Sequence, residues 1–288
     1  MDSFTLRPVD VGERDVIRRI RDVDYELFDH GSGRPVLLLH GFTGRGDWFD
    51  RFPDLSVRLV SPSLLGHGGT SHRDVNRMRM SQQVRDLSNL LDLDDRPWTV
   101  IGYSLGGRIG MTLAACDDRV EHFIGISTTP GLESAIERRE RRAQDAELAA
   151  FLEQRGIEAF VDRWERLPLW HQTDEMRATL RLERLAQRPE ALADSLRAIG
   201  SGSMPSIWPM LDRLPRTDLI VGGRDVKFKD IARRMQARQP HIQLYEIPDA
   251  GHAPHIENAQ QFGTMIEKLI LGGNENGISS KLDIGPNV

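Results

Sequence analysis

Short runs of apolar residues alternate along the chain with stretches whose apolar residues recur at helical spacing. The run at 35–39 is continuous and is not interrupted by polar residues, as expected for a strand that is covered on both faces. Runs of this kind predict strands at residues 25–28, 35–40, 57–60, 99–103, 123–127, 217–221 and 241–247. Helical spacing predicts helices at residues 81–91, 231–238 and 258–271, and another directly after the strand at 99–103. This alternation predicts an α/β fold with a mostly parallel, doubly wound sheet that has helices on both faces.

The pattern changes between residues 132 and 212, where no strand-like run occurs. Helical stretches rich in Arg and Glu fill this region, and residues such as Pro168, Pro189 and Gly200 separate them. We therefore predict a helical cap inserted between two strands of the sheet. The expected parts are a first core segment at 22–131, the cap at 132–212, a second core segment at 213–271, and terminal extensions at 1–21 and 272–288.

Composition narrows the class of protein. The net charge of −5 over 288 residues gives no excess of basic groups for nucleic acid, so we expect no nucleic-acid partner. The single cysteine, Cys116, excludes an internal disulfide and a cysteine metal cluster, and we expect its side chain to be buried. No leader peptide or apolar stretch of about 18 residues is present, which predicts a soluble cytoplasmic protein without a membrane partner. The oligomeric state stays open.

The segment Thr99–Cys116, TVIGYSLGGRIGMTLAAC, has the pattern of a nucleophile elbow. A buried strand turns sharply at Gly102-Tyr103-Ser104-Leu105-Gly106 into a helix of small and apolar residues. Glycines on both sides are expected because a Cβ there would collide with the neighbouring strand or helix. Ser104 is therefore the candidate nucleophile or base.

A serine needs an imidazole that takes its proton and a carboxylate that orients the imidazole. Asp225 follows the predicted strand at 217–221, and His252 follows the one at 241–247. These residues come after Ser104 in the order that this architecture requires. Asp218 is a poorer candidate because it lies at the start of its strand. A metal pair of His252 and His255 would lack a third ligand, so no metal is expected.

Two backbone N–H groups are candidates for an oxyanion hole. In this arrangement one donor follows the serine, here Leu105, and the other lies in the loop after the second strand, here Phe42. That loop begins with His40-Gly41, and both assignments rest on position alone.

Arg108 lies four residues after Ser104 in an otherwise apolar helix. A guanidinium there faces a large desolvation cost unless an anion compensates it. Two interpretations are open, a contact to an anionic substrate and a structural salt bridge.

The chain resembles the α/β-hydrolases over roughly residues 25–271. Within that superfamily, several longer segments resemble the MenH-type 2-succinyl-6-hydroxy-2,4-cyclohexadiene-1-carboxylate synthases of menaquinone and phylloquinone biosynthesis. These segments are LHGFTG at 39–44, GYSLGGR at 102–108, PGL at 130–132 followed by ERRERRAQD, WERLPLW at 164–170, GSGSMPSIW at 200–208, GGRDVKF at 222–228 and AGHAPH at 250–255.

The resemblance implies a cofactor-independent lyase that eliminates pyruvate from a succinyl-enolpyruvyl-hydroxycyclohexene-carboxylate, with the Ser-His pair as base. Its substrate would be a small tricarboxylate, which is an anion for Arg108. The resemblance also implies carboxylate-binding roles for Arg141 and Arg184, and pocket-lining positions for Tyr103 and Trp164.

Two departures from the family pattern stand out. Ser63 occupies the position of the usual Asp in the loop Ser63-Leu64-Leu65-Gly66-His67-Gly68, and Met204 stands where the family has Gln. The absence of the Asp concerns the bracing of the loop more than the chemistry, and the absence of the Gln weakens any role for that side chain.

Two other functions remain open at this point. A hydrolase of the same fold would use the triad to cleave an ester or a carbon–carbon bond of an anionic substrate. A catalytically silent homologue would keep the pocket and bind a ligand with it.

Overall fold

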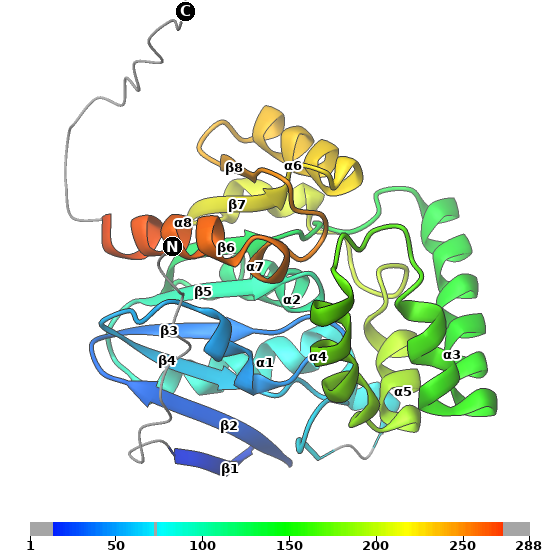
Figure 1. The fold of residues 1–288 in the computed structure, drawn as a ribbon. Helices are drawn as coiled ribbons and strands as arrows, with labels where there is room; N and C mark the ends of the chain where they lie inside the picture. Colours follow the sequence, from blue (N-terminus) through cyan, green and yellow to red (C-terminus); the bar gives the residue numbers. More distant parts are fainter. Residues whose placement is uncertain (1–13, 72–73, 273–288) are drawn as a thin grey trace, which may run out of the picture.

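A computed structural model describes residues 14–71 and 74–272. Its centre is an eight-stranded sheet with the order β1-β2-β4-β3-β5-β6-β7-β8 (Figure 1). The strands are β1 (Arg14–Ile20), β2 (Val23–Gly31), β3 (Arg34–Leu39), β4 (Val57–Pro62), β5 (Trp98–Tyr103), β6 (Val120–Ile126), β7 (Arg216–Gly222) and β8 (Gln243–Ile247). The pairs β1–β2 and β2–β4 are antiparallel, and all the other pairs are parallel. The sheet is therefore mostly parallel, as predicted.

Helices cover both faces of the sheet because the central strands are apolar on both faces. The side chains of Leu37 and Leu39 join one core, to which α1 (Met80–Leu90), α2 (Leu105–Ala114) and α6 (Val226–Arg238) contribute. Val36 and Leu38 join a second core on the opposite face, with α8 (Ala259–Leu271) and the 3-10 helix η1 (Gly46–Arg51). Shorter helical turns are η2 (Val75–Met78), η3 (Leu91–Leu93), η4 (Trp208–Arg213) and α7 (Pro254–Glu257).

Three helices are inserted between β6 and β7. They are α3 (Ala135–Trp164), α4 (Asp174–Leu185) and α5 (Pro189–Ile199), and they stand together at one end of the sheet (Figure 1). Phe160, Leu192 and Leu196 help to form a small core of their own. The long helix α3 is interrupted at Gly156, where φ is 76°. The inserted helices thus cover the sheet edge at which the predicted catalytic residues lie.

Three expectations from the sequence need correction. The extension expected at 1–21 contains β1, an edge strand that pairs with β2. Val16 and Ile17 of β1 are exposed. The strand does not have the continuous apolar run that is typical of a central strand. The helix expected at 231–238 begins earlier, at Val226. Cys116, whose side chain was expected to be buried, is exposed. Residues 1–13 and 273–288, the rest of the predicted extensions, lie outside the described residues.

None of the helices among residues 14–71 and 74–272 is long and apolar enough to cross a membrane.

Glu26 of β2 holds the loop at residues 63–68, in which Ser63 stands at the position of the Asp expected from the resemblance. The hydroxyl of Ser63 donates to Glu26 at 2.5 Å, and the backbone N–H of Gly69 donates to it at 2.9 Å. Burial raises the pKa of Glu26, but hydrogen bonds from Arg45, Ser63 and Gly69 outweigh it and lower the pKa to about 2. A carboxylate from a neighbouring strand therefore holds this loop.

Candidate active site

Ser104 lies at the sharp turn between β5 and α2. Its backbone has φ 48° and ψ −102°, a left-handed conformation that is costly for any residue other than glycine. A Cβ on Gly102 would lie 2.5 Å from the carbonyl oxygen of Gly106, and one on Gly106 would lie 2.1 Å from that of Leu39. The glycines of the elbow therefore permit the close approach of α2 to β3 and β5.

The structure brings Ser104, His252 and Asp225 together from three loops. The distance from His252 Nε2 to Ser104 Oγ is 3.1 Å, and that from His252 Nδ1 to Asp225 Oδ2 is 2.8 Å. An ionised carboxylate only accepts hydrogen bonds, so Nδ1 carries the proton and Nε2 is free to accept the serine proton. Asp225 also accepts from the N–H of Phe228 at the start of α6, which fixes the carboxylate. The arrangement can move a proton.

Phe42 and Leu105, the two predicted oxyanion-hole residues, lie at the edge of the site. Leu105 is the first residue of α2, and Phe42 follows β3. Among the hydrogen bonds of the described residues, none uses the N–H of Leu105 or Phe42 as donor. The N–H of Gly106 donates to the carbonyl of His40 at 3.0 Å, which ties the start of α2 to the loop that carries Phe42. Both free N–H groups are thus available to an anionic oxygen.

A cavity of about 500 Å³ opens beside Ser104 and His252. Its walls come from the sheet edge and from the inserted helices. Phe42, Tyr103, Leu105 and Trp164, all predicted to lie at the site, line it. The cationic side chains in its wall are Arg108, Arg141, Arg163 and Lys227, and the acidic ones are Asp145 and Glu147.

Arg108 has no carboxylate partner within the part of the chain that the structure describes. Its guanidinium donates to the carbonyl of Ile199 at 2.6 Å and to the sulfur of Met204 at 3.4 Å. Burial, together with the nearby charge of Arg141, lowers the pKa of Arg108 to about 10. Arg108 therefore forms no salt bridge among the described residues, although the nearby charge of Asp145 favours its charged form. The charge of Arg108 remains available to an anion in the cavity.

Arg141 and Lys227 both line this cavity, and their charges lie close enough to repel each other. Nε of Arg141 donates to Asp145 at 2.8 Å. Lys227 forms no ion pair with the residues that the structure describes, and its ammonium lies 5.4 Å from the centre of the Phe228 ring. Desolvation and the charge of Arg141 lower the pKa of Lys227. Sequence reasoning missed Lys227, although it belongs to the segment GGRDVKF that carried the resemblance.

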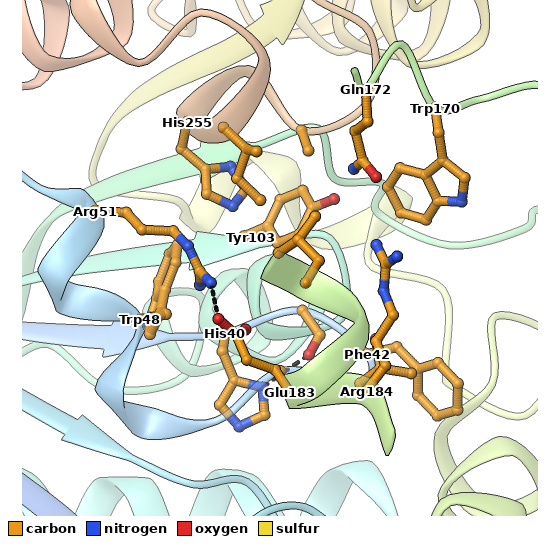
Figure 2. A pocket seen from close by; sticks show the side chains of 16 residues that line it. His40, Phe42, Trp48, Arg51, Tyr103, Trp170, Gln172, Glu183, Arg184 and His255 are labelled. Atoms are coloured by element: carbon orange, nitrogen blue, oxygen red, sulfur yellow. Dashed lines mark hydrogen bonds and ion pairs between the residues drawn. The ribbon is translucent and has the colours of Figure 1, made fainter. Parts of the chain in front are cut away.

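Arg184 does not line this cavity. It lines a second, smaller cavity of about 50 Å³, which shares Phe42, Tyr103 and Trp170 with the first. Figure 2 shows its guanidinium pointing from α4 toward Tyr103 and Trp170. It is 5% exposed and donates to Glu165 at 2.9 Å. The structure therefore differs from the expectation that Arg184 lines the same cavity as Ser104, because the contacts with Glu165 and Trp170 hold its side chain in the smaller cavity.

The histidines of the smaller cavity are structural. Burial lowers the pKa of His40 to about 4, and its Nε2 accepts the N–H of Leu64 at 2.9 Å. Burial and the charge of Arg51 hold the pKa of His255 well below its ordinary value. His255 packs on Tyr103 with ring centres 4.4 Å apart. No group of three His, Cys, Asp or Glu side chains suited to a metal occurs in the described residues.

Known proteins of one family are similar to this chain over most of its length. A model of the alpha/beta hydrolase family matches residues 36–263. A Bacillus subtilis (strain 168) protein, provisionally named 2-succinyl-6-hydroxy-2,4-cyclohexadiene-1-carboxylate synthase, is 35% identical over 262 residues, covering 86% of this chain and 95% of the relative. The enzyme of that name from Yersinia pseudotuberculosis is 32% identical over 247 residues, covering 82% of this chain and 86% of the relative. The solved structure of MenH from S. aureus superposes with a TM-score of 0.81 at 30% identity, covering 85% of this chain and 98% of that one.

Proposed function

The chain belongs to the alpha/beta hydrolase family and, within it, to the 2-succinyl-6-hydroxy-2,4-cyclohexadiene-1-carboxylate synthases, and we propose that Ser104, His252 and Asp225 carry out its reaction. The protein is a lyase that eliminates pyruvate from a succinyl-enolpyruvyl-hydroxycyclohexene-carboxylate. The observation that carries the assignment of these residues is a proton-transfer triad beside a cavity whose Arg108 has no carboxylate partner among the described residues.

The elimination begins with loss of a proton next to the succinyl carbonyl. The Ser104–His252 pair accepts this proton, and Asp225 stabilises the imidazolium that forms. Negative charge then develops on the carbonyl oxygen, where the N–H groups of Phe42 and Leu105 stabilise it. As the carbon–carbon double bond forms, the carbon–oxygen bond to the enolpyruvyl group breaks. The leaving enolate takes up a proton and departs as pyruvate, and no acyl-enzyme is formed.

The cavities divide the carboxylates of the substrate between them. Arg108 and Arg141 of the larger cavity, with Lys227 at its wall, bind carboxylates of the ring and succinyl portions. Arg184 binds a carboxylate only from the smaller cavity, which adjoins the larger one at Tyr103 and Trp170. Tyr103 and Trp164 supply apolar wall for the ring.

We place the cap at residues 132–212 over core segments that run from residue 14 to 131 and from 213 to 271. The chemistry requires no metal or nucleotide, so dialysis against a chelator should leave the rate unchanged. The tricarboxylate is the proposed partner, with no nucleic acid or membrane surface involved, and the proposed location is the cytoplasm, which fractionation of host cells tests.

The decisive experiment measures pyruvate. Purified protein is mixed with the enolpyruvyl tricarboxylate, and pyruvate is followed through the oxidation of NADH by added lactate dehydrogenase. A parallel sample contains p-nitrophenyl acetate. Release of pyruvate supports the lyase, whereas rapid ester hydrolysis without any pyruvate would favour a hydrolase with the same triad. Binding of the tricarboxylate without any turnover would favour the silent homologue.

A further inference from the structure

Gln187 lies in the connection between α4 and α5, and its side chain reaches out of the cap to the loop that carries Phe42. Its Nε2 donates to the carbonyl of Thr43 at 3.3 Å and to that of Gly44 at 3.1 Å. Its Oε1 accepts the N–H of Gly68 at 3.1 Å. The residue is 6% exposed, and the Gly68 contact sets which end of the amide faces which loop. A single buried amide thus joins the cap to two loops of the core.

The loop that Gln187 holds is a strained turn. The N–H of Gly44 donates to the carbonyl of Gly41 at 3.0 Å, so Phe42 and Thr43 are the two central residues of a four-residue turn. Thr43 has φ 66°, at a position where such turns prefer glycine. A non-glycine residue in this conformation is strained and persists only when its surroundings hold it. The amide of Gln187 supplies part of that support, since it binds the carbonyls of Thr43 and Gly44.

The N–H of Phe42 belongs to the same turn. Any rotation of the turn that released Thr43 would also move this N–H relative to Ser104. A displacement of about 1 Å at a reacting centre can cost on the order of 100-fold in rate. The position of the oxyanion donor therefore depends on the position of Gln187.

Gln187 also follows directly on the last turn of α4. Its N–H donates to the carbonyl of Arg184 at 3.3 Å, and Glu183 of that turn pairs with Arg51 of η1. The last turn of α4 forms one wall of the smaller cavity. A shift of the last turn of α4 relative to the core would therefore also shift Gln187, and with it the N–H of Phe42.

We propose that Gln187 is a positioning residue that couples seating of the cap to assembly of the oxyanion hole. This inference rests on the proposed function, since it gives the Phe42 N–H a role in stabilising the developing enolate. It adds that the cap closes the cavity and also completes the catalytic geometry.

Two substitutions of Gln187 and one matched control test the proposal. Gln187→Met removes all three hydrogen bonds at nearly constant volume, and Gln187→Glu keeps an acceptor for Gly68 but removes the donor to Thr43 and Gly44. The control is Arg188→Met. Arg188 is the next residue and donates to the carbonyl of Thr70 at 2.6 Å, so its loss removes a bond between cap and core that does not involve the turn.

We expect both Gln187 variants to lower kcat for pyruvate release by about 10- to 100-fold, while KM changes less than about threefold. Arg188→Met should retain kcat within about twofold. This should hold even if Arg188→Met and Gln187→Met lower the melting temperature by the same amount. Equal losses of kcat in Arg188→Met and Gln187→Met, or a Gln187→Met enzyme with unchanged kcat, would overturn the proposal.

A second readout does not depend on the lyase substrate. Phenylboronic acid adds to a serine hydroxyl and places an anionic oxygen where an oxyanion would lie. Its inhibition constant, measured by displacement or calorimetry, should rise about tenfold in Gln187→Met and stay unchanged in Arg188→Met. A wild-type protein that binds the boronate but releases no pyruvate would contradict the proposed function, whereas equal boronate affinity in wild type and Gln187→Met would contradict the role of Gln187.

Discussion

The two cavities that meet at Tyr103 differ in how their charges are compensated. In the smaller one, Arg184 pairs with Glu165 and Arg51 pairs with Glu183. In the larger one, Arg108 contacts only a carbonyl and a sulfur within the described part of the chain. A buried cation with a carboxylate partner is already stabilised, while one without such a partner gains most from an incoming anion. We therefore propose that the larger cavity is the main anion site and that the paired charges of the smaller one leave it a lesser share of substrate binding.

The largest expected effect concerns the triad, which serves the larger cavity. Ser104→Ala and His252→Ala should each lower the rate of pyruvate release on the order of 1,000-fold, because each removes the route by which the proton leaves carbon. Stopped-flow or coupled assays of pyruvate measure this directly. Binding of the tricarboxylate, measured by calorimetry, should change little, and a variant that retains more than about a tenth of the wild-type rate would exclude the residue as part of the base.

The second largest expected effect is a loss of folding stability at acidic pH, and it arises from His40 in the smaller cavity. The pKa of His40 is lowered to about 4 in the folded protein, whereas an unfolded histidine has a pKa of about 6.5. The unfolded state therefore binds more protons between these values, and folding stability should fall as the pH decreases from about 6.5 to 4. For His40 alone the loss is about 3 kcal/mol, and His255 acts in the same direction. Urea unfolding at pH 7.5 and 5.0 tests this, and equal free energies of unfolding at the two pH values would contradict it.

Substitution of one arginine from each cavity tests the comparison itself. Arg108→Met should lower kcat/KM for the tricarboxylate by about 10- to 100-fold and leave turnover of a neutral p-nitrophenyl ester within about threefold. Arg184→Met should cost less activity but should lower the free energy of unfolding by about 1–3 kcal/mol, because Glu165 loses a partner. A pattern in which Arg184→Met affects only activity and Arg108→Met only stability would reverse the assignment of the two cavities.

The smallest expected effect is that of Lys227. Lys227→Gln should raise KM for the tricarboxylate about threefold, more at low than at high salt, since the ammonium lies near the cavity wall and is partly screened. Lys229→Gln is the matched control two residues away, because Lys229 pairs with Glu246 at 3.5 Å and does not line the cavity. Equal shifts of KM in the two variants would mean that general charge, and not Lys227 itself, attracts the substrate.

Much of the site could be predicted because its residues follow recognisable strands. Ser104, Asp225 and His252 come directly after apolar runs, and parallel strands bring their carboxyl ends to one edge of a sheet. The structure places these three side chains within hydrogen-bond distance. Arg108 was identifiable because a charge in an apolar helix needs an explanation.

Features that depend on distant partners could not be predicted. The side chain of Arg184 is directed by the orientation of α4 and by Glu165, 19 residues away, and neither leaves a mark in the local pattern. The bonds of Gln187 reach Thr43 and Gly44 more than 140 positions earlier in the chain. The strand β1 escaped prediction because its exposed Val16 and Ile17 give it neither a continuous apolar run nor a clear alternation.

The central claim is that the triad beside the larger cavity removes a proton from a tricarboxylate and expels pyruvate. The most direct test follows pyruvate and the cyclohexadiene product together in one reaction of the metal-free wild-type protein with the enolpyruvyl substrate. We predict that both products appear at the same rate and in a 1:1 ratio. Consumption of the substrate without pyruvate, or with succinate as the released acid, would contradict the account.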